Sequence, residues 1–491
     1  MSFEWIGAAT LVAGIVCLFD GRRFAIIALV LSTLLGAATA SVLTFLGSAN
    51  LPPSHLLFGF VVLIAARRRF LGRVLASYAW PNPGWWLLCT LIYALIVTLF
   101  MPRILAGWTD VFTIARTDSG ESGLLLTPLG PVSGNVTQTV YFIGDVVCFG
   151  IFQAFAGDRD GKRWLAGAFI ACGFVDILFA ALDYLTYYTQ TADYLFFMRN
   201  ATYRMLDTAE VVGVKRLVGS FPEASAFATA TLTLFAFSST LWLNGYQPRT
   251  TGPLALLLLA TLILSTSATA YVSLTLYLAI VYLVNGWAAL SGRQGKTRYG
   301  VLALGPILLG LGIGAVLLDA KLSSGIQDLL DQLIFQKGGT DSAAERGSWN
   351  SQALVNFIDS YGIGIGIGSA RASNFLLAAL ANIGIVGTFA YGAFILGCLR
   401  APSSERDETS RTIRSAAAFA CLSLVISGSL AGTTIDLGLL FFICAGLATS
   451  STSVGVPATP TGAPIRRAHA PQGQKSFPPP AFNGGSKAMP L

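Results

Sequence analysis

Long apolar stretches, separated by short polar connections, run along most of this chain. Many of them hold about 18 or more mostly apolar residues, enough for a helix to cross roughly 30 Å of hydrocarbon. The pattern predicts about 12 to 13 transmembrane helices. The expected spans are residues 3–19, 24–47, 52–66, 84–101, 136–156, 164–182, 222–243, 252–265, 268–289, 300–318, 374–398, 413–430 and 434–450.

Composition agrees with a membrane protein. The chain has 491 residues, of which 54% are hydrophobic and 11% charged, whereas soluble domains carry about 25% charged residues. We therefore expect an all-α polytopic membrane domain over residues 1–450. The segment 451–491 is rich in Pro, Gly, Ser and Ala, which predicts a disordered cytoplasmic tail. The cysteines form no CxxC pair, so we expect neither a disulfide framework nor a zinc site.

Basic residues predict which connections face the cytoplasm. They gather in alternate connections, at 22–23, 67–73, 157–163, 293–298 and 399–414. Because short cytoplasmic loops carry an excess of Lys and Arg, these connections are expected to be cytoplasmic. The opposite face then carries three longer segments, at 102–135, 183–221 and 319–373. Long ordered loops on a rigid scaffold often carry function, and the second and third are the places where we expect it.

The second and third outward loops contain more cations than this face of a membrane protein normally has. They are Arg199, Arg204, Lys215, Arg216, Lys321, Lys337, Arg346 and Arg371. Arginine keeps its charge and donates paired hydrogen bonds that match phosphate. The cluster therefore predicts a surface that holds phosphate.

The third loop contains two amphipathic pieces. Residues 326–334 place apolar side chains on one face, so we expect a helix along the membrane surface. The piece that follows carries Arg346 and, three residues later, Trp349, which would share a helical face. The alternative is an interfacial tryptophan beside a solvated arginine.

A run of alternating glycines, "YGIGIGIGSARASN" at 361–374, ends this loop. It is not a P-loop, since no Lys-Ser or Lys-Thr follows the glycines. Glycines such as Gly364 and Gly366 leave the backbone bare, so that a ligand or another chain segment can approach closely. Arg371 nearby favours a ligand, and the alternative is simple packing of the loop on helices.

Two acids, Asp145 and Asp176, fall inside predicted spans. An unpartnered acid in hydrocarbon costs about 2.5 to 3.5 kcal/mol or more. We expect both to face the protein interior, either in ion pairs with outward arginines that brace the bundle or in the lining of an active cavity.

Two stretches resemble the bacterial O-antigen ligase and O-antigen (Wzy-type) polysaccharide polymerase superfamily. They are "KRLVGSFPEASAFATATL" (215–232) and "ERGSWNSQALVNFIDSYGIGIGIGSARASNFLLAALANIGIVGTFAYG" (345–392). The resemblance implies a GT-C-like glycosyltransferase of the bacterial inner membrane with a periplasmic active site. Its donor would be a polyprenyl-diphosphate-linked (undecaprenyl diphosphate) glycan and its acceptor another glycan. It implies neither metal nor cofactor, no nucleic acid partner, and a chain-length regulator and a flippase as further partners.

Carried over residue by residue, the resemblance gives Arg216 and Arg346 the role of gripping the donor diphosphate as it leaves. Glu223 is the nearest acid to the first stretch and is expected to accept the acceptor proton or to orient Arg216. Further substrate-binding candidates are Arg371, Arg204, Lys215, Trp349, Gly364, Gly366 and Asn374.

The resemblance departs from the ligase pattern at one position. Ligases of the superfamily have a histidine just before the asparagine that opens the late helix, whereas Ser373 precedes Asn374 here. The chain's two histidines, His55 and His469, offer no obvious replacement. This favours a polymer-forming enzyme that extends O-antigen, capsule or exopolysaccharide. Two alternatives stay open: a ligase that moves glycan to lipid A or protein, and a lipid-linked oligosaccharide flippase or transporter.

Overall fold

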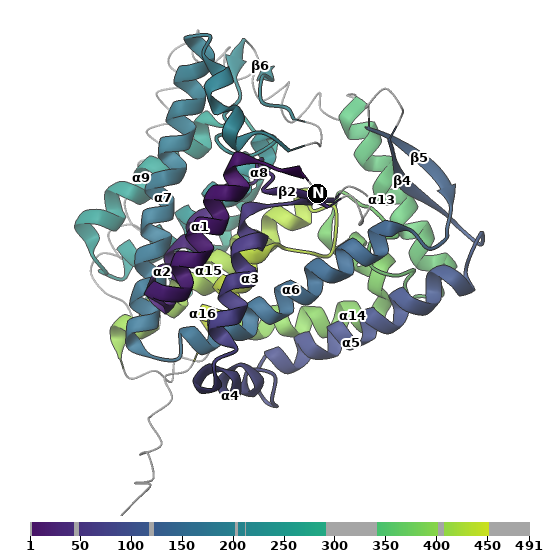
Figure 1. Ribbon diagram of the computed structural model, residues 1–491, viewed down its shortest axis with the longest axis horizontal. Helices are drawn as coiled ribbons and strands as arrows, with labels where there is room; N and C mark the ends of the chain where they lie inside the picture. The colour runs from purple at the N-terminus through teal and green to yellow at the C-terminus, as the bar shows by residue number, and fades with distance from the viewer. Residues whose placement is uncertain are drawn as a thin grey trace, which may run out of the picture. The chain divides into compact units, whose positions relative to one another are not determined.

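The computed structural model describes residues 2–43, 49–116, 122–201, 205–211, 213–290, 341–400 and 407–450 (Figure 1). The expected span at 300–318, the surface helix at 326–334, the tail from 451 and Arg204 all lie outside these residues. Within them the protein is mostly helical, which confirms the predicted fold class.

Helices follow one another along almost the whole chain. They are α1 (Trp5–Asp20), α2 (Arg22–Ser32), α3 (Pro53–Ala65), α4 (Arg68–Ala76), α5 (Gly84–Ile104), α6 (Ser133–Phe155), α7 (Arg159–Tyr188), the 3-10 helix η2 (Ala192–Met198), α8 (Ala224–Leu243), α9 (Pro248–Leu264), α10 (Ala268–Leu290), α13 (Asp341–Asp359), α14 (Phe375–Leu399), α15 (Glu408–Ala431) and α16 (Leu439–Thr449). Among the described residues, 7 helices are long and apolar enough to cross a membrane, namely α5, α6, α7, α8, α10, α14 and α15. The helices α1, α3, α9 and α16 are apolar but shorter. The chain is therefore a multi-pass helical membrane protein.

Short antiparallel strands, which the sequence did not predict, occur in the connections. β1 (Ser2–Phe3), β2 (Ser41–Leu43) and β3 (Ala49–Leu51) form one sheet in that order. β4 (Asp110–Arg116) and β5 (Ser122–Pro128) form a hairpin in which Asp110 pairs with Pro128. β6 (Glu210–Val211) pairs with β7 (Val214–Lys215) just before Arg216.

The predicted span at 24–47 is wrong in its second half. Helix α2 ends at Ser32. The chain then turns, and its backbone forms hydrogen bonds with other segments. Ala37 N–H donates to Ser220 O at 2.9 Å, and the Asn200 side chain bonds both backbone groups of Thr39 at 2.8 and 3.1 Å. Hydropathy cannot separate a helix from an apolar stretch whose backbone polar groups are satisfied elsewhere.

Four of the predicted cytoplasmic connections meet at one end of the bundle, which we call the basic end; the fifth, 293–298, lies outside the described residues. Arg22 forms an ion pair with Asp158 at 2.7 Å, and the Arg67 guanidinium donates to Leu18 O at 3.2 Å. Arg159 lies 3.8 Å from Asp407. These contacts join connections that are far apart in sequence. The opposite end, where α2 stops and β6 lies, is called the loop end (Figure 1). It holds the described residues of 33–43, 49–52, 189–201, 205–211, 213–223 and 432–438.

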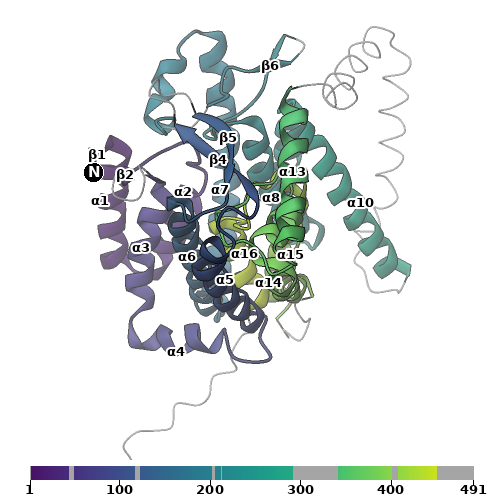
Figure 2. The same cartoon turned by 90° about the vertical axis from the view of Figure 1, so that its right-hand side faces the viewer.

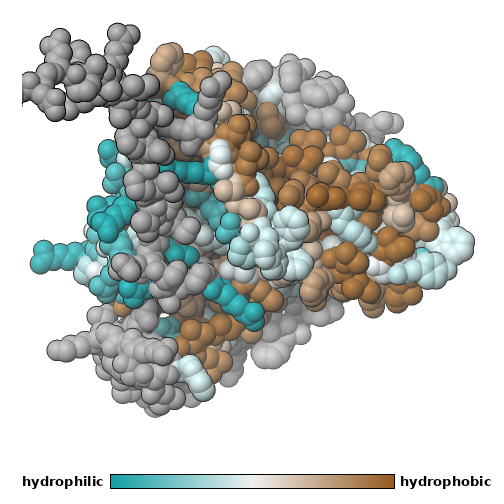
Figure 3. All heavy atoms as spheres, turned by 90° about the horizontal axis from the view of Figure 1, so that it is seen from below, coloured by the Kyte–Doolittle hydropathy of each residue, from teal (hydrophilic) through white to brown (hydrophobic). Residues whose placement is uncertain are grey.

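Apolar side chains cover much of the molecule's exterior. On α5, Ile92, Ile96 and Leu99 are all exposed, and on the outlying helix α10 the same holds for Leu283 and Trp287. Figure 2 shows α10 standing away from the packed helices, and Figure 3 shows broad apolar areas between polar patches. Such surface suits contact with lipid, where helices satisfy their own backbone.

The glycine run forms a non-helical segment that packs against a break in α14. Within α14, Gly384 has φ 59° and ψ −166°, which interrupts the helical hydrogen bonds. Residues of the run restore them: Ile365 N–H donates to Ala381 O and Gly366 N–H to Asn382 O, both at 2.9 Å. Ile385 N–H in turn donates to Gly362 O at 2.9 Å. Irregular backbone inside a membrane protein is tolerated when neighbours satisfy it in this way.

Candidate functional site

Arg216 lies at the loop end and forms no ion pair with a described residue. The residue follows β7 directly and is half-buried, and its Nε is buried with no hydrogen-bond partner among the described residues. Burial lowers the pKa of its guanidinium, Glu223 opposes that shift, and the like charge of Arg346 adds to it. Arg216 and Arg346, from two different loops, therefore lie within electrostatic range of each other.

Arg346 and Trp349 share helix α13, as predicted, and Trp349 connects this helix to Arg371. The guanidinium carbon of Arg371 lies 5.8 Å from the centre of a Trp349 ring, a cation–π distance. The Arg371 Nε is buried and lacks a partner among the described residues. Burial lowers the pKa of Arg371, and the nearby Glu345 only partly offsets it.

We call Arg216, Arg346 and Arg371 the arginine cluster. Across the described ranges, none of the three forms an ion pair. Half-buried guanidinium groups are costly unless an anion neutralises them, and Arg216 and Arg346 also repel each other. A negatively charged group bound here would offset both costs.

Lys215, the neighbour of Arg216, is fully committed inside the protein. Only 1% of it is exposed, and its Nζ donates to both carboxylate oxygens of Asp183, at 2.9 and 3.0 Å. Arg199 binds the same carboxylate at 2.5 Å. Asp183 also accepts from the N–H groups of Val218 and Gly219, at 2.9 and 3.2 Å. We call this set the Asp183 hub; its contacts favour a structural role for Lys215 rather than the predicted role in substrate binding.

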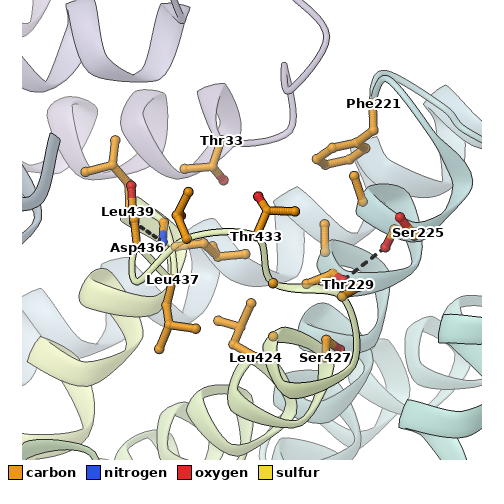
Figure 4. Close-up of a pocket in the computed structure, with 18 of the residues that line it drawn as sticks. Thr33, Phe221, Ser225, Thr229, Leu424, Ser427, Thr433, Asp436, Leu437 and Leu439 are labelled. Carbon is orange, nitrogen blue, oxygen red and sulfur yellow. Dashed lines mark hydrogen bonds between the residues drawn. The ribbon is translucent and has the colours of Figure 1, made fainter. Parts of the chain in front are cut away.

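Glu223 is the one sequence-predicted site residue that also lines the cavity found at the loop end (Figure 4). It occupies the position before α8, and the hydroxyl of Ser225 donates to its carboxylate. The cavity has a volume of about 380 Å³. Hydroxyl side chains are frequent in its lining: Thr33, Ser54, Ser225, Thr229, Ser427, Thr433 and Thr434. Glu223 therefore lies between the charge of Arg216 and a cavity lined with hydroxyl groups.

Two further ionisable residues in this cavity, His55 and Asp436, were missed by sequence reasoning. Asp436 lies in the turn between α15 and α16, and its Oδ1 accepts from Gly438 N–H at 2.5 Å. A lone acid, in "TTIDLG", between two apolar runs was the available signal. Its meaning depends on α6, because Asp145 of that helix lies within side-chain hydrogen-bonding range of Asp436.

The expectation that Asp145 and Asp176 pair with arginines is wrong within the described residues. Both are buried and face inward, as predicted. Asp176 accepts from the hydroxyl of Thr231 at 2.8 Å, and Asp145 has no donor among the described side chains. The carboxylate that does take the loop cations is Asp183, at the end of α7 nearest the loop.

Gly364 and Gly366 are packed against the protein's own backbone. Both have positive φ, 95° and 97°, and a Cβ on Gly364 would lie 2.6 Å from Gly384 N. A Cβ on Gly366 would lie 3.0 Å from the Cα of Thr98. The space that these glycines provide is therefore filled by α14 and α5, which favours the packing alternative.

Asn374 caps helix α14. Its side-chain oxygen accepts from Leu376 N–H at 2.9 Å and Leu377 N–H at 3.2 Å, and its amide donates to Ser429 O at 2.8 Å. These bonds use the side chain fully and fix the start of α14, three residues after Arg371.

Comparison with known proteins adds no family to this picture. No protein-family model matches the sequence, and no curated protein matches it. What the described residues show is a multi-pass helical membrane protein in which three arginines form no ion pair with a described residue, and in which Glu223, close to Arg216, lines a cavity with hydroxyl and carboxylate groups.

Proposed function

We propose that this protein is a membrane glycosyltransferase that polymerises polyprenyl-diphosphate-linked oligosaccharide repeat units. The observation that carries the proposal is the arginine cluster: Arg216 and Arg371 each hold a buried, unpartnered Nε, and Arg216 lies within electrostatic range of Arg346. A diphosphate supplies several oxygens and the negative charge that such a cluster lacks.

The chemistry of glycosyl transfer uses this charge directly. As the bond between the anomeric carbon and the diphosphate oxygen breaks, negative charge builds on the leaving group, and fixed cations stabilise it. Each charge-assisted hydrogen bond contributes about 1.5 to 3 kcal/mol. Arg216 and Arg346 are the principal donors in this proposal, and Arg371, stacked on Trp349, is the third.

The cavity beside Glu223 supplies a place for the acceptor. Glycan hydroxyl groups exchange hydrogen bonds with hydroxyl and carboxylate side chains, and this cavity is rich in both. Its volume of about 380 Å³ falls in the range of small-molecule sites. Glu223 interacts with Arg216 and lines the cavity, so it connects the donor and acceptor positions and orients Arg216.

The membrane setting follows from the distribution of basic residues. The loop end lies opposite the basic end, and the positive-inside rule assigns the basic end to the cytoplasm of a bacterial inner membrane. The arginine cluster would then face the periplasm, where lipid-linked repeats are polymerised in the superfamily that residues 215–232 and 345–392 resemble. A flippase and a chain-length regulator are the partners that this role implies.

A transfer assay with purified protein tests the proposal. Protein in lipid nanodiscs is incubated with a polyprenyl-diphosphate-linked repeat unit, and products are separated by size. Longer lipid-linked chains, lost in Arg216→Ala and Arg346→Ala, support a polymerase. Transfer of glycan only onto lipid A or protein would show that the protein is a ligase rather than a polymerase. Absence of any new glycosidic bond would overturn the enzymatic proposal.

A flippase or transporter is the second candidate, and the buried acids favour it. Asp145 and Asp176 lie inside α6 and α7, where ionisable side chains often mark an ion or substrate path. Movement of lipid-linked glycan across vesicle membranes without new glycosidic bonds would establish this candidate. Transfer activity that survives without a membrane potential favours the enzyme.

A further inference from the structure

Two neighbouring carboxyl groups, one of which lines the cavity, are separate from the arginine cluster. Asp436 lines the cavity, and Asp145 lies within side-chain hydrogen-bonding range of it. Asp145 is 0% exposed, and no Lys or Arg of the described ranges pairs with either acid. Two carboxylates this close cannot both stay ionised, because like charges at hydrogen-bonding distance repel strongly.

The proton belongs on Asp145. Its carboxyl is fully enclosed in α6 and receives no hydrogen bond from a described residue, so ionisation there would leave a charge without solvation. Asp436 is only partly buried, lines the cavity, and accepts from Gly438 N–H at 2.5 Å. Asp145 is therefore the enclosed member of the pair, and Asp436 is the member that a bound ligand can reach.

A second, independent feature indicates that the cavity holds a polar ligand. Ser427 lines it, is only 1% exposed, and its Oγ has no hydrogen-bond partner among the described residues. Figure 4 shows Ser427 and Asp436 among the side chains around the cavity. A buried hydroxyl without a partner is rare in proteins unless a ligand or water satisfies it.

We propose that Asp436 is the proton acceptor for a glycan hydroxyl bound in this cavity, and that Asp145 behind it positions its carboxylate. The proposal rests on the proposed glycosyl transfer. The acceptor O–H bond breaks and its proton moves to the Asp436 carboxylate, while the hydroxyl oxygen forms the new bond to the anomeric carbon. The bond from that carbon to the donor diphosphate breaks, and its electron pair leaves with the diphosphate.

Glu223, the other carboxylate of the lining, is already occupied. It accepts from the Ser225 hydroxyl and interacts with the charge of Arg216. Asp436 has no such cation among the described residues, so its carboxylate remains available to a substrate proton.

Other titratable groups face the pair from three helices. His55 of α3 lies near Asp436, and its ring centre is 4.9 Å from that of Tyr141 on α6. Cys148 of α6 lies near Asp145, and Tyr391 of α14 lies near both acids. His55 also lines the cavity and its imidazole can accept a proton, so His55→Gln serves as the control for the role of Asp436.

Infrared spectroscopy tests the pair without substrate. Protein in nanodiscs, in an Asp176→Asn background that removes the other enclosed acid, should show the carbonyl band of a protonated carboxyl at neutral pH. The band should vanish in Asp145→Asn and shift in Asp436→Asn, where an amide replaces the accepting carboxylate. Absence of the band, or a band that Asp436→Asn leaves unmoved, overturns the pair.

The transfer assay tests the catalytic role. Asp436→Asn should lower transfer by about a hundredfold, the usual size of a general-base contribution, while Asp436→Glu restores part of it. Asp145→Asn keeps a side chain of the same size that can donate to Asp436, so it should lower transfer less than Asp145→Leu, which cannot. Equal losses in the two variants would remove the positioning role of Asp145.

Failure of this inference and failure of the proposed function look different. An active wild type that loses activity in Arg216→Ala but keeps it in Asp436→Asn leaves the enzyme standing and overturns the proton acceptor. A wild type without transfer activity removes both the proton-acceptor role and the enzyme. Loss of transfer in His55→Gln together with activity kept in Asp436→Asn would assign the proton acceptor to the histidine instead.

Discussion

Lys215 and Arg216 are neighbours in the chain but occupy opposite electrostatic situations. Lys215 is buried and donates to both oxygens of Asp183, and Arg199 binds the same carboxylate. Arg216 is half-buried, has a buried Nε without a partner among the described residues, and lies near another arginine. Asp183 neutralises Lys215, whereas Arg216 forms no ion pair with a described residue and its charge can interact with a ligand.

The difference separates structural charge from functional charge. The Asp183 hub ties the end of α7 to the turn at Val218 and Gly219, so it fixes the backbone on which Arg216 stands. The arginine cluster carries positive charge that the described protein does not balance. Substitutions in the Asp183 hub should therefore lower the stability of the fold, and substitutions in the arginine cluster should lower transfer activity.

The largest expected effect is on stability, from Asp183→Ala. The change leaves the buried Lys215 without its carboxylate partner and Arg199 with Asp207 at 3.6 Å, which costs about 3 to 5 kcal/mol for a broken buried pair. Thermal unfolding of the protein in detergent, followed by its intrinsic fluorescence, measures the loss. Arg216→Met is the matched control, and we expect it to change stability by no more than about 0.5 kcal/mol. Equal losses in the two variants would erase the distinction between hub and cluster.

Next in size is the effect of Arg216→Ala or Arg346→Ala on polymerisation. Loss of one charge-assisted hydrogen bond should slow transfer by about ten- to a hundredfold, because the leaving diphosphate is less stabilised. In cells that depend on this protein, lipid-linked single repeats should accumulate while the protein remains in the membrane. Polymer of normal length in both variants would contradict the role of the cluster.

Substitution in the glycine segment should have a smaller effect. Gly364→Ala places a Cβ 2.6 Å from Gly384 N in a backbone conformation with φ 95°, so we expect a loss of stability of about 1 to 3 kcal/mol. Gly392→Ala in α14 is the control, since a Cβ there would meet no heavy atom of another described segment within 4 Å. Thermal unfolding compares the two. A tolerated Gly364→Ala would show that the segment keeps open space for a ligand.

The smallest effect is expected from Asn374→Ala. Loss of the cap at the start of α14 should cost about 1 kcal/mol of stability. Because the cap lies close to Arg371, transfer should fall only by the amount that the lower stability explains. Asn374→Asp keeps the accepting oxygen of the cap but loses the donor to Ser429 O, so it should restore only part of the stability measured by thermal unfolding. A large loss of transfer at unchanged stability would return Asn374 to the substrate-binding residues.

Hydropathy was sufficient to predict most of the helices, because a membrane helix satisfies its own backbone and needs only length and apolar side chains. It failed at 33–43, where Ser220 and Asn200 satisfy backbone groups from far along the chain. The glycine run was recognised as a close approach, but its partner, the break at Gly384 in α14, is not visible in a local pattern.

Sequence reasoning located the cations of the site better than its acids. Arg216, Arg346 and Arg371 were conspicuous because cations are scarce in outward loops. Lys215 and Arg199 cannot be distinguished from these arginines in the sequence. They differ because the fold places Asp183 next to them. Asp436 and Asp145 are 291 residues apart in the sequence. Their proximity is therefore apparent only in the folded structure.

Direct binding of a polyprenyl diphosphate to purified protein is the measurement that tests the central claim. We predict saturable binding to the wild type that weakens at least about tenfold in Arg216→Ala and in Arg346→Ala, as loss of a charge-assisted bond requires. Arg103→Ala should bind like the wild type, since this exposed arginine only donates to Leu99 O at 2.6 Å. Equal binding by all four proteins would contradict an arginine cluster built for a diphosphate.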